Sequence, residues 1–490
     1  MADSWVNSAE SLGADLHLEL TGPGSRRAVL MRALRDAVRS GRLAPGTRLP
    51  PYRSLAADLG IARNTVADAY AELVAEGWLT ARQGSGTRVA QQVAPIAPAP
   101  RRRTPARAHR PVYDLVQGKP DPSVFPRAAW LASARRALSA APHEAFGPGD
   151  PRGRVELREA LAGYLARVRG VRTTPERIVL CSGAAHALRL MAAVAGGRWA
   201  VESYGLPFHR GLLAGEGVAT RPIGVDEHGA LVEELAGEDV VLLTPAHQFP
   251  TGGPLRPERR AAVVDWARSS GALVLEDDYD GEFRYDRQPV GAVQSLDPDR
   301  VVLMGSVSKS LSPTLRIGWM VLPERLADDV VEAKGEREQW SSATEQLTLA
   351  DFIVSGAYDR HVRKMRQRYR RRRDQLVSVL AERAPQVRVT GIAAGLHAVL
   401  ELPPGTERAV VKAAAWQGLA VEGLADYRHP GLPANERDGL VANGRDGLVA
   451  NGRDSLAAHA RDGLVVGYAT PPEHAYAAAL DTLCRALPLD

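Results

Sequence analysis

The sequence predicts two folded modules, a small helical one that ends in a β-hairpin and a large α/β one with a mainly parallel sheet. At 490 residues, the chain is longer than one domain usually is. Residues 91–111, QQVAPIAPAPRRRTPARAHRP, hold five prolines and almost no aliphatic side chains, which is typical of a stiff, extended linker. Helical spacing dominates before this stretch, and short apolar runs alternate with helical patterns after it. We therefore place the modules at 1–90 and 112–490.

Composition excludes several classes of protein. Hydrophobic residues make up 45% and charged residues 24% of the chain, which is ordinary for a soluble globular protein. The two cysteines, Cys181 and Cys484, are too few and too far apart for a disulfide framework. No apolar run approaches the ~18 residues that a membrane span needs, and the polar N-terminus carries no signal-peptide pattern. We expect a cytoplasmic protein with no membrane contact and no metal site.

The positive charge of the chain is concentrated near its N-terminus. The formal net charge is +5, yet residues 1–111 contain 16 arginines and only nine acidic residues. The rest of the chain is therefore slightly acidic. A basic module attached to a near-neutral body favours nucleic acid as a partner.

The small module shows three helical patterns followed by two short strands. The helices are predicted at Ser25–Ser40, Arg53–Leu59 and Asn64–Glu76, and the first and third carry apolar side chains along one face. Trp78–Thr80 and Thr87–Val89 predict a two-stranded wing around a glycine-containing turn. A helix, a helix–turn–helix and a hairpin in this order make the winged-helix plan.

Within this module the segment Leu49–Ala90 resembles the GntR-type winged helix–turn–helix. A helix fits the major groove and its first turn faces the base edges, so Arg63 is placed to read guanine and Asn64 to read adenine. Thr65 is placed to cap this helix or to contact a phosphate. The partner is expected to be double-stranded DNA. The predicted DNA-binding residues are Arg53, Arg63, Asn64, Thr65, Arg82, Gly84, Ser85 and Gly86.

The large module alternates strands and helices, as a parallel sheet covered by helices on both faces requires. The predicted strands include Ile178–Cys181, Val240–Leu243, Leu273–Leu275, Val301–Met304, Gly318–Val321 and Leu464–Val466. The predicted helices include Arg154–Val168, Ala184–Val194 and Pro257–Ser269. The last ~100 residues form a smaller C-terminal α/β subdomain in this prediction.

Three segments of the large module suit pyridoxal 5′-phosphate. In Gly305–Trp319, GSVSKSLSPTLRIGW, Lys309 lies among small hydroxyl side chains and is followed by Arg316. A lysine forms an imine with the cofactor, while hydroxyls and an arginine fork suit its phosphate. Ala272–Tyr285 is a strand with acids at its carboxyl end, where ligands sit in open α/β sheets. In Leu180–Leu188 a Ser-Gly turn opens a helix whose first backbone N–H groups suit a phosphate.

Together these features make the chain similar to the MocR subfamily of GntR-type regulators, in which a winged helix–turn–helix is fused to a fold-type I aminotransferase-like domain. The matching segments also include Thr244–Leu255, Gly149–Gly153 and Glu345–Arg366. The resemblance implies a homodimer in which Lys309 is the Schiff-base lysine, Asp277 pairs with the pyridine nitrogen and Tyr279 contacts the phenolic oxygen. The residues that it implies around the phosphate are Ser182, Gly183, Ala184, Ser306, Ser308 and Arg316.

The sequence departs from the family pattern at several positions. Pro148 replaces the tyrosine that reaches the phosphate in the partner subunit, and Leu206 replaces the tyrosine that stacks on the cofactor ring. Leucine covers the ring without the stacking energy of about 1 kcal/mol. In GABA-sensing members an arginine grips the effector where this chain has Phe208, so we do not expect GABA as the ligand. Pro51 and Tyr52 stand where the reading module usually has two small polar residues.

Secondary expectations concern the surroundings of the site. Tyr204 or Phe208 is a candidate to supply the aromatic ring from a shifted backbone. Asp278 and Asp280 are expected to be solvated loop carboxylates. The basic helix around Lys364–Arg373 is expected to be solvated or to flank a dimer, with a second DNA contact as the alternative.

Residues 435–466 form four octads, NERDGLVA, NGRDGLVA, NGRDSLAA and HARDGLVV. A period of eight fits neither an α-helix nor a known solenoid repeat. It indicates a tandem duplication that lengthened a surface loop, because such loops grow at low thermodynamic cost. A binding tract of regularly spaced arginines is the alternative.

Three functions are open on this evidence. The first is a regulator that senses pyridoxal phosphate, or an amine or amino acid, through the Lys309 imine, with vitamin B6 metabolism as its target. The second is an aminotransferase, which also needs an arginine for the substrate carboxylate. Candidates for that arginine are Arg428, Arg437, Arg445, Arg453 and Arg461. The third is a DNA-binding dimer whose large domain does not sense a ligand. The fused winged helix favours the first, with at most residual transaminase activity.

Overall fold

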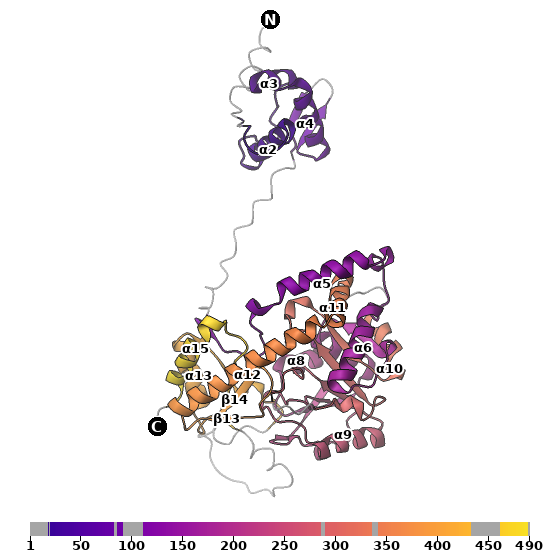
Figure 1. Ribbon diagram of the computed structural model, residues 1–490, viewed down its shortest axis with the longest axis vertical. Helices are drawn as coiled ribbons and strands as arrows, with labels where there is room; N and C mark the ends of the chain where they lie inside the picture. The colour runs from indigo at the N-terminus through magenta and orange to yellow at the C-terminus, as the bar shows by residue number, and fades with distance from the viewer. Residues whose placement is uncertain are drawn as a thin grey trace. The chain divides into compact units, whose positions relative to one another are not determined.

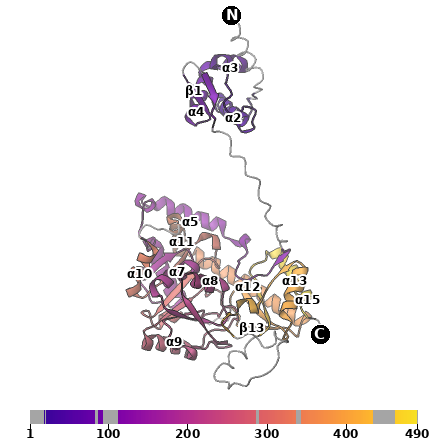
Figure 2. The same ribbon diagram turned by 180° about the vertical axis from the view of Figure 1, so that it is seen from behind.

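The computed structural model describes residues 18, 20–82, 86–91, 111–285, 290–335, 342–432 and 461–488. The chain divides into two compact units, an N-terminal unit of residues 1–108 and a C-terminal unit of residues 109–490 (Figures 1 and 2). Across the described ranges, no helix has both the length and the apolar character needed to span a bilayer.

The N-terminal unit is the winged helix that the sequence predicts. Its elements are α2 (Arg26–Arg39), α3 (Tyr52–Leu59), α4 (Arg63–Ala75), β1 (Leu79–Arg82) and β2 (Gly86–Val89). The apolar faces of the three helices meet in one core with β1 and β2. Gly60, in the left-handed conformation at φ 63°, ends α3 and makes the turn into α4. Helices α3 and α4 each begin one residue earlier than expected, at Tyr52 and Arg63.

A seven-stranded sheet forms the centre of the C-terminal unit, in the order β4-β12-β11-β10-β9-β5-β6. Only β12 runs antiparallel to its neighbours, so the predicted mainly parallel sheet is confirmed. The carboxyl ends of the other six strands therefore lie along one edge. The strands are β4 (Ile178–Cys181), β5 (Arg198–Glu202), β6 (Ala219–Ile223), β9 (Val240–Leu243), β10 (Leu273–Asp277), β11 (Val301–Ser306) and β12 (Gly318–Val321).

Helices cover both faces of this sheet. One face packs against α6 (Val155–Arg169), α9 (Pro257–Ser270) and α11 (Ala343–Val354). The other face packs against α7 (Ala184–Ala195), α8 (Pro207–Gly215) and α10 (Glu324–Lys334). The strands consist of nearly continuous valine and leucine runs because both of their faces are buried. A further helix, α5 (Arg127–Ala140), packs on α11 through Trp130 and Phe352.

The predicted smaller C-terminal subdomain is confirmed. Its antiparallel sheet has the order β13-β14-β17-β16. Its elements are β13 (Arg388–Thr390), β14 (His397–Glu401), α13 (Glu407–Trp416), β15 (Leu419–Ala420), β16 (Glu422–Gly423), β17 (Gly463–Gly467) and α15 (Glu473–Ala486). Of the octad segment, residues 435–460 lie outside the described ranges, and the final octad leads into β17.

The subdomain also takes up the start of the C-terminal unit. Strand β3 (Tyr113–Asp114), the first element after the predicted linker, pairs in parallel with β15. Leu115 follows β3 and is fully buried in the subdomain core. The segment after the linker is therefore anchored on the C-terminal subdomain rather than on the large sheet.

The long helix α12 (Ala357–Arg383) leads from α11 to the subdomain (Figure 1). The basic run was expected to be solvated or to flank a dimer, and most of its basic side chains are exposed, but Arg368 and Arg372 bind within the C-terminal unit. Arg372 is almost fully buried and donates to the backbone carbonyls of Tyr468 and Pro471. Arg368 forms ion pairs with Asp121 and Glu473. Part of the basic run thus ties the helix to its own subdomain, which the run of charges alone did not reveal.

Candidate functional site

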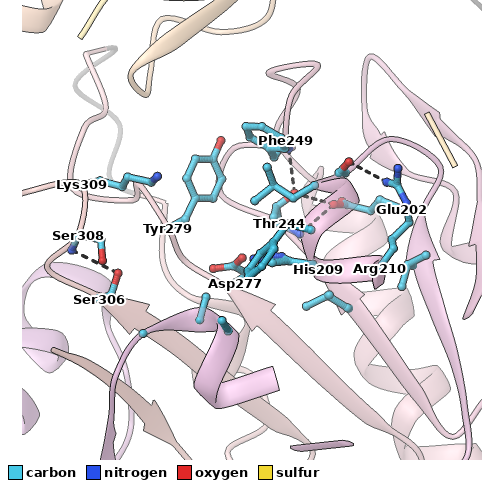
Figure 3. A pocket seen from close by; sticks show the side chains of 18 of the residues that line it. Glu202, His209, Arg210, Thr244, Phe249, Asp277, Tyr279, Ser306, Ser308 and Lys309 are labelled. Atoms are coloured by element: carbon cyan, nitrogen blue, oxygen red, sulfur yellow. Dashed lines mark hydrogen bonds between the residues drawn. The ribbon is translucent and has the colours of Figure 1, made fainter. Parts of the chain in front are cut away.

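A cavity of about 300 Å³ opens at the carboxyl edge of the large sheet (Figure 3). Four neighbouring strands end there, so side chains distant in sequence meet: Glu202 ends β5, Thr244 follows β9, Asp277 ends β10 and Ser306 ends β11. The beginning of α7 closes another side. Of the predicted cofactor residues, the wall contains Gly183, Ala184, Asp277, Tyr279, Ser306, Ser308, Lys309 and Arg316.

Lys309 follows β11 and extends into the cavity (Figure 3). Its Nζ donates a hydrogen bond to the backbone carbonyl of Gly118, at 2.6 Å. Burial lowers the pKa of Lys309, while the carboxylates of Asp277 and Asp280 oppose that shift. A lysine with a lowered pKa offers the free amine that a nucleophile requires.

Asp277 is buried at the end of β10. Burial raises its pKa to about 7, with smaller contributions from Asp278 and Asp280, and Lys309 acts in the opposite direction. A carboxyl group in this position gains from a cationic partner, because a nearby positive charge stabilises its ionised form. The protonated nitrogen of a pyridine ring is such a partner.

Another group of residues in the wall suits an anion. Gly183, at φ 105°, precedes α7, whose N-terminus has no side-chain cap. A Cβ added to Gly183 would lie 3.8 Å from both terminal nitrogens of Arg316, so a side chain there would enter the space before the guanidinium. Backbone N–H groups, Arg316 and two serines together match the donors that a phosphate prefers. Ser182 is not part of the wall, and its N–H donates to His186 Nδ1 at 3.2 Å.

A buried polar cluster lies behind Tyr279. The Tyr279 hydroxyl is 2.9 Å from His247 Nδ1, which is also 2.8 Å from Asp280 Oδ2. Asp280 is 2% exposed, so its expected role as a solvated loop carboxylate is wrong. The ring of His397, from β14 of the subdomain, lies 5.3 Å from that of His247. This cluster connects the cavity wall to the C-terminal subdomain.

Asp278 is not a solvated carboxylate either. Its two oxygens accept from Arg169 Nε at 2.8 Å and Nη2 at 2.9 Å. Both side chains are less than 10% exposed. The pair holds the residue next to Asp277 against the end of α6, so it fixes the strand end that carries the buried carboxyl group. The partner lies 109 positions away, and no local pattern signals it.

The remaining wall is largely apolar and aromatic. Tyr204, Leu206, Phe208 and Phe249 all line it, so either of the two proposed aromatic replacements is close to the cavity. Phe249 lies within a segment that already matched the family. The sequence also gave no indication of His209, whose pKa is lowered to about 4 by burial and by the charges of Lys309 and Arg210.

The cavity wall offers few cations for a carboxylate. Among its described residues the arginines are Arg210 and Arg316. Arg210 donates to the backbone carbonyls of Gly205, Tyr427 and Arg428. Arg428 is outside the wall, and Arg461 lines a separate cavity of about 240 Å³. The other candidates, Arg437, Arg445 and Arg453, lie outside the described residues.

Glu202 is a buried acid that the sequence did not single out. Its Oε2 accepts from the Thr244 hydroxyl at 2.6 Å and from the Thr244 N–H at 3.2 Å. The Thr244 hydroxyl in turn accepts from the Phe249 N–H at 2.9 Å. Burial raises the pKa of Glu202 from 4.5 to about 7, against the hydrogen bonds from Thr244.

Replacing Glu202 by glutamine is therefore expected to stabilise the chain above pH 7 by about 1–2 kcal/mol. The folded state holds the Glu202 proton between pH 4.5 and about 7 and the unfolded state does not, so wild-type stability falls as pH rises through this window. A glutamine oxygen still accepts from Thr244 and carries no charge. Urea unfolding of both proteins at pH 5 and pH 8 measures the difference. An identical pH dependence for the two proteins would contradict the assignment.

The predicted DNA-binding residues lie at the ends of the helices and in the wing. Arg53, Arg63, Asn64, Arg82 and Gly86 are exposed, while Thr65 is half-buried. Ala62 is the N-cap of α4 and no side chain caps the helix, so Thr65 does not have the capping role. Gly84 and Ser85 lie outside the described residues.

Arg63 has a neighbour that was not expected. Its Cζ lies over the Tyr52 ring, 5.1 Å from the centroid, and Nη2 is 3.5 Å from the Tyr52 hydroxyl. The hydrogen bond and the charge of Arg63 lower the pKa of Tyr52. The arginine at the start of α4 is therefore in contact with the first residue of α3.

Comparisons with known proteins match both units. Residues 27–89 match the family of bacterial regulatory proteins of the gntR type, and residues 112–437 match aminotransferase class I and II. The pyridoxine biosynthesis transcriptional regulator PdxR of Corynebacterium glutamicum is 34% identical, over 84% of this chain and 92% of that protein. The probable rhizopine catabolism regulatory protein MocR of Rhizobium meliloti is 32% identical, over 71% and 76%. A Pyrococcus horikoshii kynurenine aminotransferase structure has a TM-score of 0.65 at 22% identity, over 76% and 90%, which shows the shared fold.

Proposed function

Because the chain belongs to the MocR-type transcriptional regulators of the GntR family, which bind DNA, we propose that its large domain binds pyridoxal 5′-phosphate and reports this ligand, or an amine that reacts with it, to the DNA-binding module. The cofactor supplies an aldehyde that condenses with a primary amine and a ring that withdraws electrons. The groups that line the cavity support this assignment, since the Lys309 amine, the buried Asp277 carboxyl group and donors suited to a phosphate surround the same space.

The predicted cofactor residues each have a role in this proposal. Lys309 would supply the free amine that burial favours, and Asp277 would hold the ring nitrogen in its protonated form. Tyr279 would donate to the phenolic oxygen, and the His247–Asp280 pair would orient its hydroxyl. The phosphate is bound by Gly183, Ala184, Ser306, Ser308 and Arg316, with Ser182 just outside the wall.

The observation that supports coupling between the cavity and the linker is the hydrogen bond from Lys309 Nζ to the Gly118 carbonyl. A lysine nitrogen joined to the ligand would keep at most one proton, instead of the two of the free amine, so this hydrogen bond would be weakened or lost. Gly118 lies four residues after β3, and β3 is the first element after the linker. Ligand attachment thus alters the restraint on the segment that continues into the linker, and coupling requires such a difference between two states.

The direct test is a DNA-binding titration of the full chain on the upstream region of its own gene, at fixed salt, with and without pyridoxal phosphate. We expect the dissociation constant or the footprint to change with the ligand. An unchanged constant and footprint, with the ligand shown to be bound, would contradict a sensing role and leave a DNA-binding dimer with a silent large domain.

Gly118→Ala is expected to bring the ratio of DNA affinities with and without ligand close to one. Gly118 has φ +82°, and an added Cβ would lie 3.1 Å from Lys309 Nζ, so the segment and the lysine must move apart. Fluorescence anisotropy on labelled DNA measures the ratio. Gly405→Ala is the matched control, since Gly405 has φ +81° and an open surrounding. Equal ratios for wild type and Gly118→Ala would exclude this route.

The cavity chemistry and the named relative both favour vitamin B6 metabolism as the regulated process. PdxR is named as a regulator of pyridoxine biosynthesis. The part of the wall formed by Leu206, Phe208 and Phe249 is apolar, with Phe208 at the position of the effector arginine, and Arg210 donates to backbone carbonyls. We therefore propose that the effector is the cofactor itself rather than an amino acid. We also expect at most residual transaminase activity.

We also propose a cytoplasmic homodimer. Leu131 on α5, Phe146 and Phe208 are large apolar side chains that are 67%, 54% and 64% exposed. Phe208 is at the same time part of the cavity wall, so a second subunit that covered it would help to close the site. Light scattering is expected to give twice the 52.6 kDa of one chain, and a monomeric mass would contradict the proposal.

A further inference from the structure

The contact between Tyr52 and Arg63 joins the two helices of the helix–turn–helix at their N-terminal ends. Tyr52 is the first residue of α3 and Arg63 the first residue of α4. The Arg63 Cζ lies 5.1 Å from the centre of the Tyr52 ring, within the distance of a cation–π interaction. The ring is 40% exposed, so the contact lies at the surface of the module rather than in its core.

The backbone before Tyr52 is fixed from both sides. Pro50 and Pro51 precede it, and each proline ring restricts φ. The buried hydroxyl of Tyr70, on α4, donates to the Pro50 carbonyl at 3.0 Å. The N–H of Leu49 donates to Thr87 in the wing strand β2 at 2.8 Å. The backbone that leads into Tyr52 is therefore held in a defined place relative to α4, the helix that carries Arg63.

This placement restricts an otherwise flexible side chain. A free arginine loses rotamer entropy when it is immobilised on a base, and a preformed contact removes part of that loss before binding. The contact leaves the recognition groups available, because the guanidinium has five N–H donors and only Nη2 approaches the Tyr52 hydroxyl, at 3.5 Å. A guanine requires two donors in a fixed fork, on its O6 and N7 atoms.

We propose that Tyr52 is a specificity-determining positioning residue, whose ring holds the Arg63 guanidinium so that its fork reads one guanine in each half-site. The inference rests on the proposed reading role of Arg63. It assigns to Tyr52 an effect on base preference rather than on affinity for the DNA backbone, since the ring acts on a group that contacts a base.

The test is selection from a random-sequence duplex pool with the full chain, followed by affinity measurements on the selected site and on variants with each base replaced. Arg63→Ala is expected to lose about 5- to 100-fold of discrimination at one guanine per half-site. Tyr52→Ala is expected to lose about two- to fivefold at the same position. Tyr52→Phe keeps the ring and is expected to remain close to wild type. None of the Tyr52 variants should change the salt dependence of binding.

The outcomes separate the inference from its premise. If Arg63→Ala leaves every base preference unchanged, the reading role of Arg63 fails. If Arg63→Ala relaxes the guanine and Tyr52→Ala does not, only the role of Tyr52 fails. A Tyr52→Ala effect that is equal for all sequences, with a shallower salt slope, would make Tyr52 a phosphate contact instead. The unfolding temperatures of wild type, Tyr52→Phe and Tyr52→Ala are measured alongside. Equal temperatures show that a change in base discrimination does not come from loss of the fold.

Discussion

Lys309→Ala is expected to abolish both the covalent attachment of pyridoxal phosphate and the effect of this ligand on DNA binding. No other described lysine lines the cavity, so the variant removes the amine that the aldehyde needs. It also removes the hydrogen bond to Gly118, so the segment after the linker should behave identically with and without ligand. Absorbance of the purified protein after ligand addition measures attachment, and anisotropy on DNA measures the response.

Two comparisons make this result specific. Lys412→Ala changes an exposed lysine on α13 and is expected to keep attachment and response. DNA affinity of Lys309→Ala without ligand is expected to change by no more than about 5- to 150-fold, since a coupling energy is typically 1–3 kcal/mol. A variant that loses attachment and still responds to the ligand would move the sensing site away from this cavity.

Asp278→Ala is expected to have the largest effect on stability, a loss of about 3–5 kcal/mol. It leaves the buried Arg169 guanidinium without its carboxylate, and an uncompensated buried charge is costly. It also frees the end of β10, so the affinity for pyridoxal phosphate should fall with it. Urea unfolding monitored by tryptophan fluorescence, and a ligand titration on the folded variant, measure the two effects.

The same helix provides the matched control. Asp359 pairs with Arg167 of α6 at 2.7 Å, but these side chains are 31% and 57% exposed. Asp359→Ala is therefore expected to cost about 1 kcal/mol or less. Similar losses for Asp278→Ala and Asp359→Ala would show that the inner pair is solvated in solution. Replacing both Arg169 and Asp278 by apolar residues is expected to cost less than Asp278→Ala alone.

The fold could be predicted because short stretches of the sequence are sufficient to identify its strands and its linker. Runs such as Val240–Leu243 and Val301–Met304 are apolar at every position since both faces of the sheet are buried, and the linker is visible in its prolines. The strand ends that bring Asp277 and Lys309 together follow from the parallel order of β10 and β11. Motif and strand order were therefore sufficient to indicate the central chemistry of the site.

The surroundings of the site depend on contacts between distant parts of the chain. Asp277, Asp278 and Asp280 lie within four residues, yet their environments differ because Arg169 reaches one of them and His247 another. Gly118 meets Lys309 from 191 positions away. Tyr52 and Arg63 come together only because the chain turns at Gly60 between their two helices. Such partners are set by packing, and no periodicity in the sequence encodes them.

The pairing of β3 with β15 has a consequence for synthesis on the ribosome. The core of the winged helix is built from residues between Leu18 and Val89, so it is complete once residue 91 has emerged. The strand that follows the linker waits for Leu419, about 300 residues later, before it has a partner. At about 5–20 residues per second, that interval lasts roughly 15 to 60 seconds. A nascent chain thus carries a folded winged helix long before the strand that anchors its linker to the C-terminal subdomain can pair.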